Sequence, residues 1–255
     1  MRHALLVLLA VCCSASVARS QTPETAEELV SKNIQARGGL EKMRAIKTYR
    51  LSGKVNLGGG VVALGTQENL RPNLIRQTFT LQGMTAVQAY DGSTGWQIQP
   101  FGGHKDPELM GEDDLRDLLL DADFDGPLVD YKEKGNTVEY LGHDTVDGDD
   151  ALRLKVTLKD GDVIYYYLDP DTYLEIRKEI QELIRGSIRE HVVELGSYKP
   201  VEGVMYPFSI SQGPKSNPAE QTTTVEKIEV NVPIPNSDFA LPASLQSDKS
   251  AGEKK

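Results

Sequence analysis

Three alternating carboxylates, Asp121, Asp123 and Asp125, are followed by Gly126 and form the residue pattern best suited to chemistry in this chain. The Asp-x-Asp-x-Asp-Gly spacing is that of the first half of a calcium-binding loop, where side-chain oxygens bind the ion and the glycine allows a sharp turn. Counted from Asp121, the twelfth position is Lys132, where such a loop needs a bidentate carboxylate. We therefore interpret the run as the end of a helix, with calcium binding as the alternative.

Other reactive side chains are scattered. His104, His143 and His191 stand alone, with no pair at metal-ligand spacing. No Gly-x-Ser-x-Gly elbow is present, and the glycines at 58–60 lie between expected strands rather than before a helix. We therefore expect no metal, no cofactor and no enzymatic activity, and a hydrolase ranks third among the functions considered.

The charge balance is acidic, with 28 Lys and Arg against 38 Asp and Glu and a net charge of −10. This balance argues against a nucleic-acid partner and against simple electrostatic binding to anionic lipid. An acidic surface is typical of a chain that stays dispersed as a monomer.

The first residues are typical of a secretory signal peptide, residues 1–20. Arg2 precedes an apolar run at 4–13, and small residues at 18 and 20 suit cleavage before Gln21. Its removal, with two arginines and no acid, takes the net charge from −10 to −12. A secreted chain of this type is expected in the periplasm.

Both cysteines, Cys12 and Cys13, lie inside this segment. The mature chain would therefore contain no disulfide and no reactive thiol. Acylation of Cys12 is the alternative, but Val11 is bulky where a lipoprotein box has a small residue. Lipoprotein anchoring is therefore not expected.

Turn residues at short intervals predict strands over most of the chain from Thr48 to about Val232. Apolar and polar residues alternate most clearly at 151–163, which predicts a sheet with one apolar and one wet face. Helices are expected at 23–37, capped by Thr22, at 40–46 and at 107–122. We expect one domain, residues 21–242, followed by a polar disordered tail, 243–255.

The predicted fold class is mainly β (α+β). A long antiparallel meander with a few helices indicates a single strongly curved sheet, or open half-barrel, with helices over its concave face. Such a sheet often encloses more space than its own side chains fill. The residues expected to line an apolar cavity and its helical lid are Trp96, Ile98, Leu115, Leu118, Leu119, Leu154, Val156, Tyr166, Leu174 and Ile176.

Four stretches of the sequence carry a resemblance to a known family. They are ARGGLEK (36–42) with IKT (46–48), YDGSTGW (90–96), LGSYKPVEGVMYP (195–207), and VNVP (230–233) with FALP (239–242). With these stretches the chain resembles the LolA-like periplasmic proteins, which sort lipoproteins to the outer membrane. The resemblance implies an open β-barrel covered by helices, an apolar cavity for acyl chains, and no catalytic residues. It also implies an arginine that locks the lid, for which Arg44, Arg50 and Arg71 are the candidates.

The function expected from these observations is a periplasmic carrier that holds acyl chains of a lipoprotein or another lipid. Its partners would be that lipid and envelope membrane proteins that donate or accept it. Burial of an acyl chain stabilises a complex by ~0.8 kcal/mol per methylene, so a carrier needs no polar motif. The alternative is a non-enzymatic envelope scaffold or interaction protein whose cavity is filled by its own side chains.

Overall fold

The computed structural model describes residues 25–246. The predicted signal peptide and most of the predicted tail lie outside them. The helices are α1 (Ala26–Ala36), α2 (Leu40–Ala45) and α3 (Glu112–Ala122), with short 3-10 turns η1 (Pro100–Gly102) and η2 (Asn236–Asp238). The strands are β1 (Thr48–Asn56), β2 (Val62–Leu70), β3 (Leu74–Leu81), β4 (Met84–Tyr90), β5 (Gly95–Gln99), β6 (His104–Leu109), β7 (Thr137–Val146), β8 (Asp149–Thr157), β9 (Val163–Leu168), β10 (Glu175–Ile184), β11 (Ser187–Gly196), β12 (Lys199–Val201), β13 (Val204–Tyr206), β14 (Ser209–Pro214) and β15 (Gln221–Val230).

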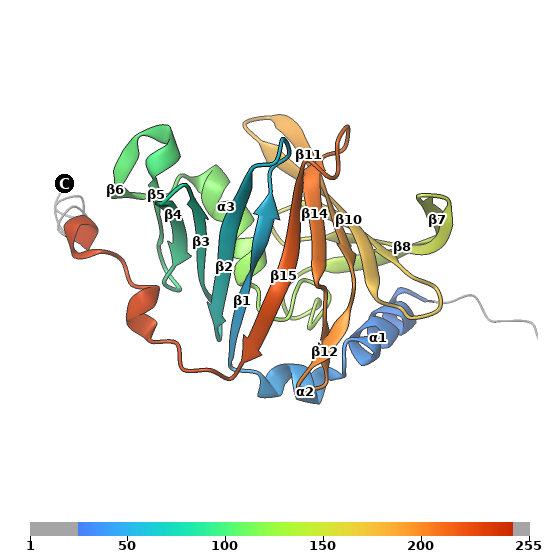
Figure 1. Cartoon of the computed structure of the whole chain (residues 1–255). Coiled ribbons are helices and arrows are strands. Elements are labelled where there is room, and N and C mark those ends of the chain that lie inside the picture. The colour runs from blue at the N-terminus through green and yellow to red at the C-terminus, as the bar shows by residue number, and fades with distance from the viewer. Residues whose placement is uncertain (1–24, 247–255) are drawn as a thin grey trace, which may run out of the picture.

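One antiparallel sheet contains thirteen of these strands, in the order β6-β5-β4-β3-β2-β1-β15-β14-β11-β10-β9-β8-β7. The pairing of β1 with β15 joins the two halves of the meander, and β6 and β7 remain as separate edges. The sheet is therefore open. It bends around α3, while α1 and α2 lie at its lower end (Figure 1). This arrangement confirms the predicted mainly-β fold with an open, curved sheet and a few helices.

The main apolar core lies where β8, β9 and β10 meet α1. Leu154, Val156, Ile164 and Tyr166 are almost fully buried there against Leu29 of α1. Their alternation along β8 and β9 is the period-2 pattern of a sheet with one buried face. The predicted alternation of this part of the sheet, with one buried apolar face, is confirmed.

Helix α1 begins later than expected. Thr25 caps it by accepting a hydrogen bond from the Glu28 amide, and Glu28 accepts one from the Thr25 amide in return. This capping box satisfies two amides that the first turn leaves without partners. The cap is therefore Thr25 rather than Thr22, which lies outside the described residues.

The third predicted helix, 107–122, is too long at its start. Pro107 belongs to β6, and α3 begins only at Glu112. An edge strand tolerates a proline because one side of its backbone needs no ladder hydrogen bond. The helix packs on β3 and β4, where Leu118 and Ala122 bury against Ile75.

The C-terminal segment is ordered further than predicted. After β15 it runs to the side of the sheet that contains β4, β5 and β6 (Figure 1). Leu241 and Leu245 are buried there with Trp96, and residues 243–246 form a helical turn. Residues 243–246, which were expected to belong to a polar tail, are therefore packed on the sheet, because Leu245 has an apolar surface to cover.

Candidate ligand pocket beneath helix α3

A pocket of about 650 Å³ lies beside α3. It is bounded by α3, the loop at 123–136, the turn between β8 and β9, and β10. Its apolar lining comes from Leu115, Leu119, Leu120, Pro127, Leu158 and Ile180, and its polar lining from Glu112, Arg116, Asp123, Lys134, Asn136, Lys159, Asp160, Asp162 and Glu182. A pocket of this size, with a mixed lining, falls in the range of small-ligand sites.

The sequence-predicted lid residues Leu115, Leu118 and Leu119 do come from one helix, but they have different surroundings. Leu115 and Leu119 line the pocket, whereas Leu118 is buried on Ile75. Leu115 also packs closely over Gly95, where an added Cβ would lie 2.5 Å from its Cδ1 atom. Helix α3 therefore forms one wall of the pocket, and two of the three leucines face it.

The other predicted lining residues lie away from this pocket. Leu154, Val156 and Tyr166 belong to the filled core. Trp96 and Ile98 lie on the outer face of the sheet under the C-terminal segment, where Trp96 Nε1 donates to the Phe239 carbonyl over 3.0 Å. Trp96 follows Gly95, which faces α3, so the alternation of a strand sends its side chain to the opposite face.

The two remaining residues, Leu174 and Ile176, precede or begin β10. A register shift between Glu175 and Arg177 turns Ile176 toward Tyr167 and Val146, on the opposite face from Ile180. A bulge of this kind re-aims one side chain and breaks the simple alternation. Leu174 is half-buried just before the strand. Neither lines the pocket.

Ion pairs tie α3 to the opposite wall of the pocket. Arg116 lies 3.1 Å from both carboxylate oxygens of Asp162, whose negative charge raises the pKa of Arg116. A second cation, Arg189 of β11, binds both Asp117 of α3 and Glu182 of β10. Helix α3 is thus held by charge on one side and by apolar packing on the other.

Glu182 is the unusual member of this group. Its side chain is only 3% exposed and lies close to Asp117 through their shared partner, Arg189. Burial, followed by the hydrogen bond and charge of Asp117, raises the pKa of Glu182 to about 7, although Arg189 opposes the shift. The nearby His191 has its pKa lowered, chiefly by burial. A carboxyl that titrates near neutral pH therefore lies where α3 meets the sheet.

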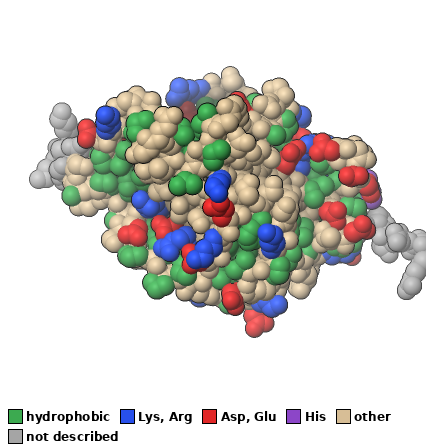
Figure 2. Space-filling model, in the orientation of Figure 1, with side chains coloured by type: hydrophobic (Ala, Val, Ile, Leu, Met, Phe, Trp, Pro, Cys, Tyr) green, Lys and Arg blue, Asp and Glu red, His purple; other side chains and the backbone are tan. Residues whose placement is uncertain are grey.

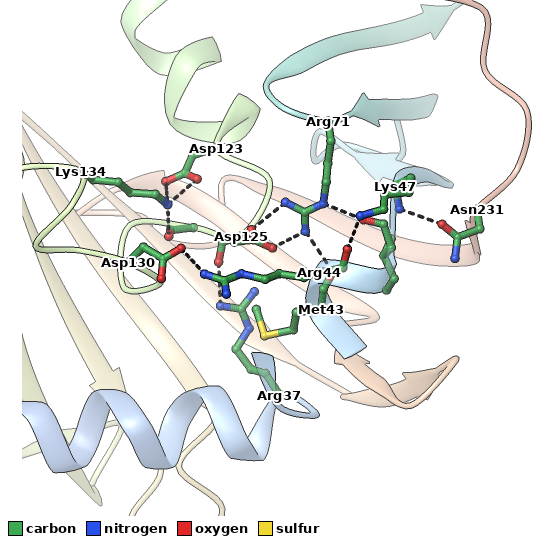
Figure 3. A network of polar contacts seen from close by, with 12 residues as sticks. Arg37, Met43, Arg44, Lys47, Arg71, Asp123, Asp125, Asp130, Lys134 and Asn231 are labelled. Carbon is green, nitrogen blue, oxygen red and sulfur yellow. Dashed lines mark hydrogen bonds and ion pairs between the residues drawn. The ribbon is translucent and has the colours of Figure 1, made fainter. Parts of the chain in front are cut away.

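The three aspartates at the exit of α3 point to three different partners. Asp121 accepts a hydrogen bond from Gln77, Asp123 pairs with Lys134 at 2.6 Å, and Asp125 pairs with Arg71. Figure 3 shows the last two pairs. Asp121 ties the last turn of α3 to β3, Asp123 and Asp125 anchor the loop that follows, and burial raises the pKa of Asp121.

Arg71 is the centre of the network in Figure 3. Its guanidinium holds both oxygens of Asp125 and donates to the carbonyls of Met43 and Ile46 at the end of α2. It also stacks over the ring of Phe124 at 4.2 Å. A planar group with five donors suits such a junction better than any other cation.

The two other candidate lid arginines make fewer contacts. Arg44 forms an exposed pair with Asp130, as Figure 3 shows. Arg50 pairs with Glu68, and both residues lie on the outer face of the sheet. Among the three candidates, Arg71 therefore makes the most contacts with the loop that follows α3.

A row of glutamines crosses the concave face and was not anticipated. Gln67, Gln77, Gln88 and Gln97 stand directly opposite one another on β2, β3, β4 and β5, and Glu108 of β6 continues the row. Gln77 donates to Gln67 over 3.1 Å as well as to Asp121. A band of amides therefore crosses this half of the concave face, next to the apolar residue Ile75 on which α3 packs.

Sequence reasoning missed Leu120, Pro127, Leu158 and Ile180 as pocket-lining residues. Leu158 continues the apolar alternation of β8, which was a usable signal, but nothing local indicates that the pocket lies at that end of the strand.

Within residues 25–246, no three His, Cys, Asp or Glu side chains are grouped as metal ligands, and no helix has the length and hydropathy of a membrane span.

Comparison of the sequence with protein-family models gave no match, and comparison with curated proteins gave none either. Several solved structures, however, are similar to this chain in fold. A DUF1329 family protein from Desulfovibrio piger aligns with a TM-score of 0.57 at 11% identity, covering 84% of this chain and 97% of its own.

Two further structures carry more specific names. A LolA superfamily protein from Nitrosomonas europaea has a TM-score of 0.54 at 11% identity and covers 86% of this chain and 98% of its own. A putative outer membrane lipoprotein-sorting protein domain from Vibrio parahaemolyticus has a TM-score of 0.53 at 10% identity and covers 82% and 97%. The open sheet wrapped around α3 is therefore a LolA-like fold.

Proposed function

We propose that this protein is a carrier that holds an acyl chain of a lipid or lipoprotein in the pocket beneath α3, within the periplasm. The observation that carries the proposal is the pocket itself, about 650 Å³ with a wall of leucine and isoleucine side chains beneath a helix that charge pairs hold in place. The names of the similar structures, a LolA superfamily protein and a putative lipoprotein-sorting domain, support the same class of function.

The lining fits an amphipathic ligand. Leu119, Leu158 and Ile180 offer apolar surface. Charged side chains of both signs line the rest of the same pocket, where Lys159 is the cation that forms no ion pair within the described part of the chain. Six methylenes buried against such a wall would contribute roughly 5 kcal/mol before ordering costs. The charged groups would then meet the polar end of the ligand. No bond is made or broken in this scheme.

Release follows from the way α3 is held. One side of the helix packs on Ile75, and the other is held by Arg116–Asp162 and by Arg189. The Arg189–Asp117 pair is the weakest of these contacts, because both side chains are exposed and water can replace an exposed ion pair more readily than apolar packing. Tilting of α3 about its packed side would therefore open the pocket.

The test is binding of a fluorescent fatty acid to the purified protein and to Leu119→Asp. Leu119 lines the pocket and is 39% exposed, so a charge there is tolerated by the fold but faces the ligand. We expect affinity to fall on the order of tenfold or more. The matched control is Leu141→Asp on β7, which is 46% exposed and lies outside the pocket.

Absence of probe uptake by the wild-type protein, together with lipid-free preparations from its native envelope, would contradict the carrier. Equal loss in Leu119→Asp and Leu141→Asp would contradict the assignment of the pocket.

The second candidate, a scaffold or interaction protein, is favoured by the glutamine row, because those amides and α3 occupy much of the concave face. Such a protein would bind no lipid.

A further inference from the structure

Eleven large hydrophobic side chains are exposed in the described part of the chain, and seven of them lie at one end of the sheet. We call these seven the apolar rim. They are Leu57, Val61 and Val62 at the β1–β2 turn, Met84 at the β3–β4 turn, Phe101 in η1, and Leu183 and Ile188 at the β10–β11 turn.

The strand directions place these turns together. In an antiparallel sheet, strands alternate in direction along the order β5-β4-β3-β2-β1-β15-β14-β11-β10. The end of β1, the end of β3, the end of β5 and the end of β10 therefore lie on the same side. Figure 1 shows the corresponding turns along the upper margin of the sheet, opposite α1 and α2.

The rim turns also lack acidic residues, although the chain carries 38 of them. The turns at 57–61, 82–83, 100–103 and 185–186 contain no Asp or Glu, and the last contains Arg185. The neighbouring turn at 215–220 has one lysine and one glutamate. Acids reach this end through the β8–β9 turn, which lines the pocket, and through the acidic first turn of α3, whose Asp113 is neutralised by Arg185.

Acidic residues lie in several turns at the other end of the strands. They include Asp91 between β4 and β5, Asp147 between β7 and β8, and Asp169 between β9 and β10. On the face seen in Figure 2, Asp and Glu side chains gather at the right, where Figure 1 places β7 and β8. The apolar rim is thus distinguished from the rest of the surface by both hydrophobicity and charge.

We propose that the apolar rim docks on the surface of a lipid bilayer. Its side chains stand on separate turns around a curved edge, rather than on one contiguous patch. A protein partner is recognised through a continuous, closely packed area, whereas a bilayer surface accepts spaced apolar tips that each enter the interface. Acid-free turns avoid repulsion from anionic headgroups, which an otherwise acidic protein would experience.

The β10–β11 turn connects the rim with the pocket. Leu183 and Ile188, which are 60% and 66% exposed, stand at its tip, next to the pocket residue Glu182. Arg185 in the turn pairs with Asp113 of α3 at 3.1 Å. Docking through this turn would therefore act on the strand that holds α3. This last step rests on the proposed carrier function, whereas the docking does not.

The experiment is flotation of the purified protein with vesicles of phosphatidylethanolamine and a minor share of phosphatidylglycerol. We expect the wild-type protein to float with the vesicles, and Leu183→Ser/Ile188→Ser to lose on the order of tenfold in partitioning. The matched control is Leu109→Ser/Leu141→Ser, which removes two exposed leucines outside the rim. We also expect binding to persist at high salt, because apolar insertion is not screened.

Failure of the wild-type protein to float would overturn the proposal, and so would equal losses in the rim and control variants. Loss of binding at high salt would overturn it too, since charge rather than apolar contact would then be responsible.

The fluorescent fatty acid assay is run in parallel without vesicles. A protein that takes up the probe but does not float contradicts only the rim proposal; one that floats but takes up no probe contradicts only the carrier. Circular dichroism of each variant confirms that its fold is retained.

Discussion

Arg71 and Asp125 form a two-point ion pair that joins the end of β2 to the loop after α3. The distances are 2.5 Å from Nη2 to Oδ1 and 2.7 Å from Nη1 to Oδ2. Burial alone would raise the pKa of Asp125, but the hydrogen bonds and charge of Arg71 outweigh it and hold this pKa below its ordinary value. The loop is therefore held where α2 ends.

Replacement of Arg71 by methionine should destabilise the protein. It removes the ion pair and the Arg71 hydrogen bond to the Ile46 carbonyl, and it leaves the Met43 carbonyl with the Ile46 amide alone. Because both charged side chains are mostly buried, we expect a loss of about 2–3 kcal/mol in the free energy of unfolding, measured by urea denaturation.

The control for this prediction is Arg44→Met, which breaks the exposed pair with Asp130 only. Exposed pairs contribute about 0–1 kcal/mol, so this variant should stay close to the wild type. Equal destabilisation of the two variants would show that Arg71 has no special role at the junction.

Glu182 should make the stability fall as pH rises from about 4.5 to about 7. The pKa of this group is higher in the folded protein than its ordinary value of 4.5. Its contribution is therefore fully present below the unfolded pKa and is lost as pH rises through the folded one. His191 acts in the opposite direction below its ordinary value of 6.5, but it is present in both proteins, so the difference between the wild type and a Glu182 variant isolates Glu182.

The measurement is the melting temperature as a function of pH for the wild type and Glu182→Gln. The amide cannot ionise, so the decrease that Glu182 causes between about pH 4.5 and pH 7 should be missing from the variant. Glu190→Gln, on the other face of the same hairpin, is the control and should keep the wild-type slope. An unchanged slope in Glu182→Gln would contradict the assignment.

The C-terminal residues 243–246 should stabilise the sheet through Trp96. Truncation after Pro242 removes Leu245, which packs with Trp96 and Leu241 on the outer face. We expect a cost of about 1–2 kcal/mol and a red shift of the emission of this single tryptophan, as water reaches its ring.

Truncation after Gln246 provides the matched control. It removes only residues outside the described part of the chain and keeps Leu245 in place. Its emission and stability should match those of the full chain. If both truncations behave alike, the contact of Leu245 with Trp96 does not stabilise the protein.

The sequence by itself determined the class of the fold. Alternation such as that from Leu152 to Val156 requires a sheet with one buried face, and the turn residues at short intervals require antiparallel connections. The grouping of Leu115, Leu118 and Leu119 required a helix with one apolar face. These signals are local, since each depends on residues within a few positions of one another.

Only the tertiary structure decided which surface each face meets. Trp96 and Gly95 are neighbours, yet one lies under the C-terminal segment and the other under α3. Both faces of that strand are covered, so alternation cannot tell inside from outside. The pairing of Asp125 with Arg71 and the row from Gln67 to Gln97 depend on long-range register, which no local pattern encodes. The pocket has the same origin, because its walls come from segments that meet only when the sheet curves around α3.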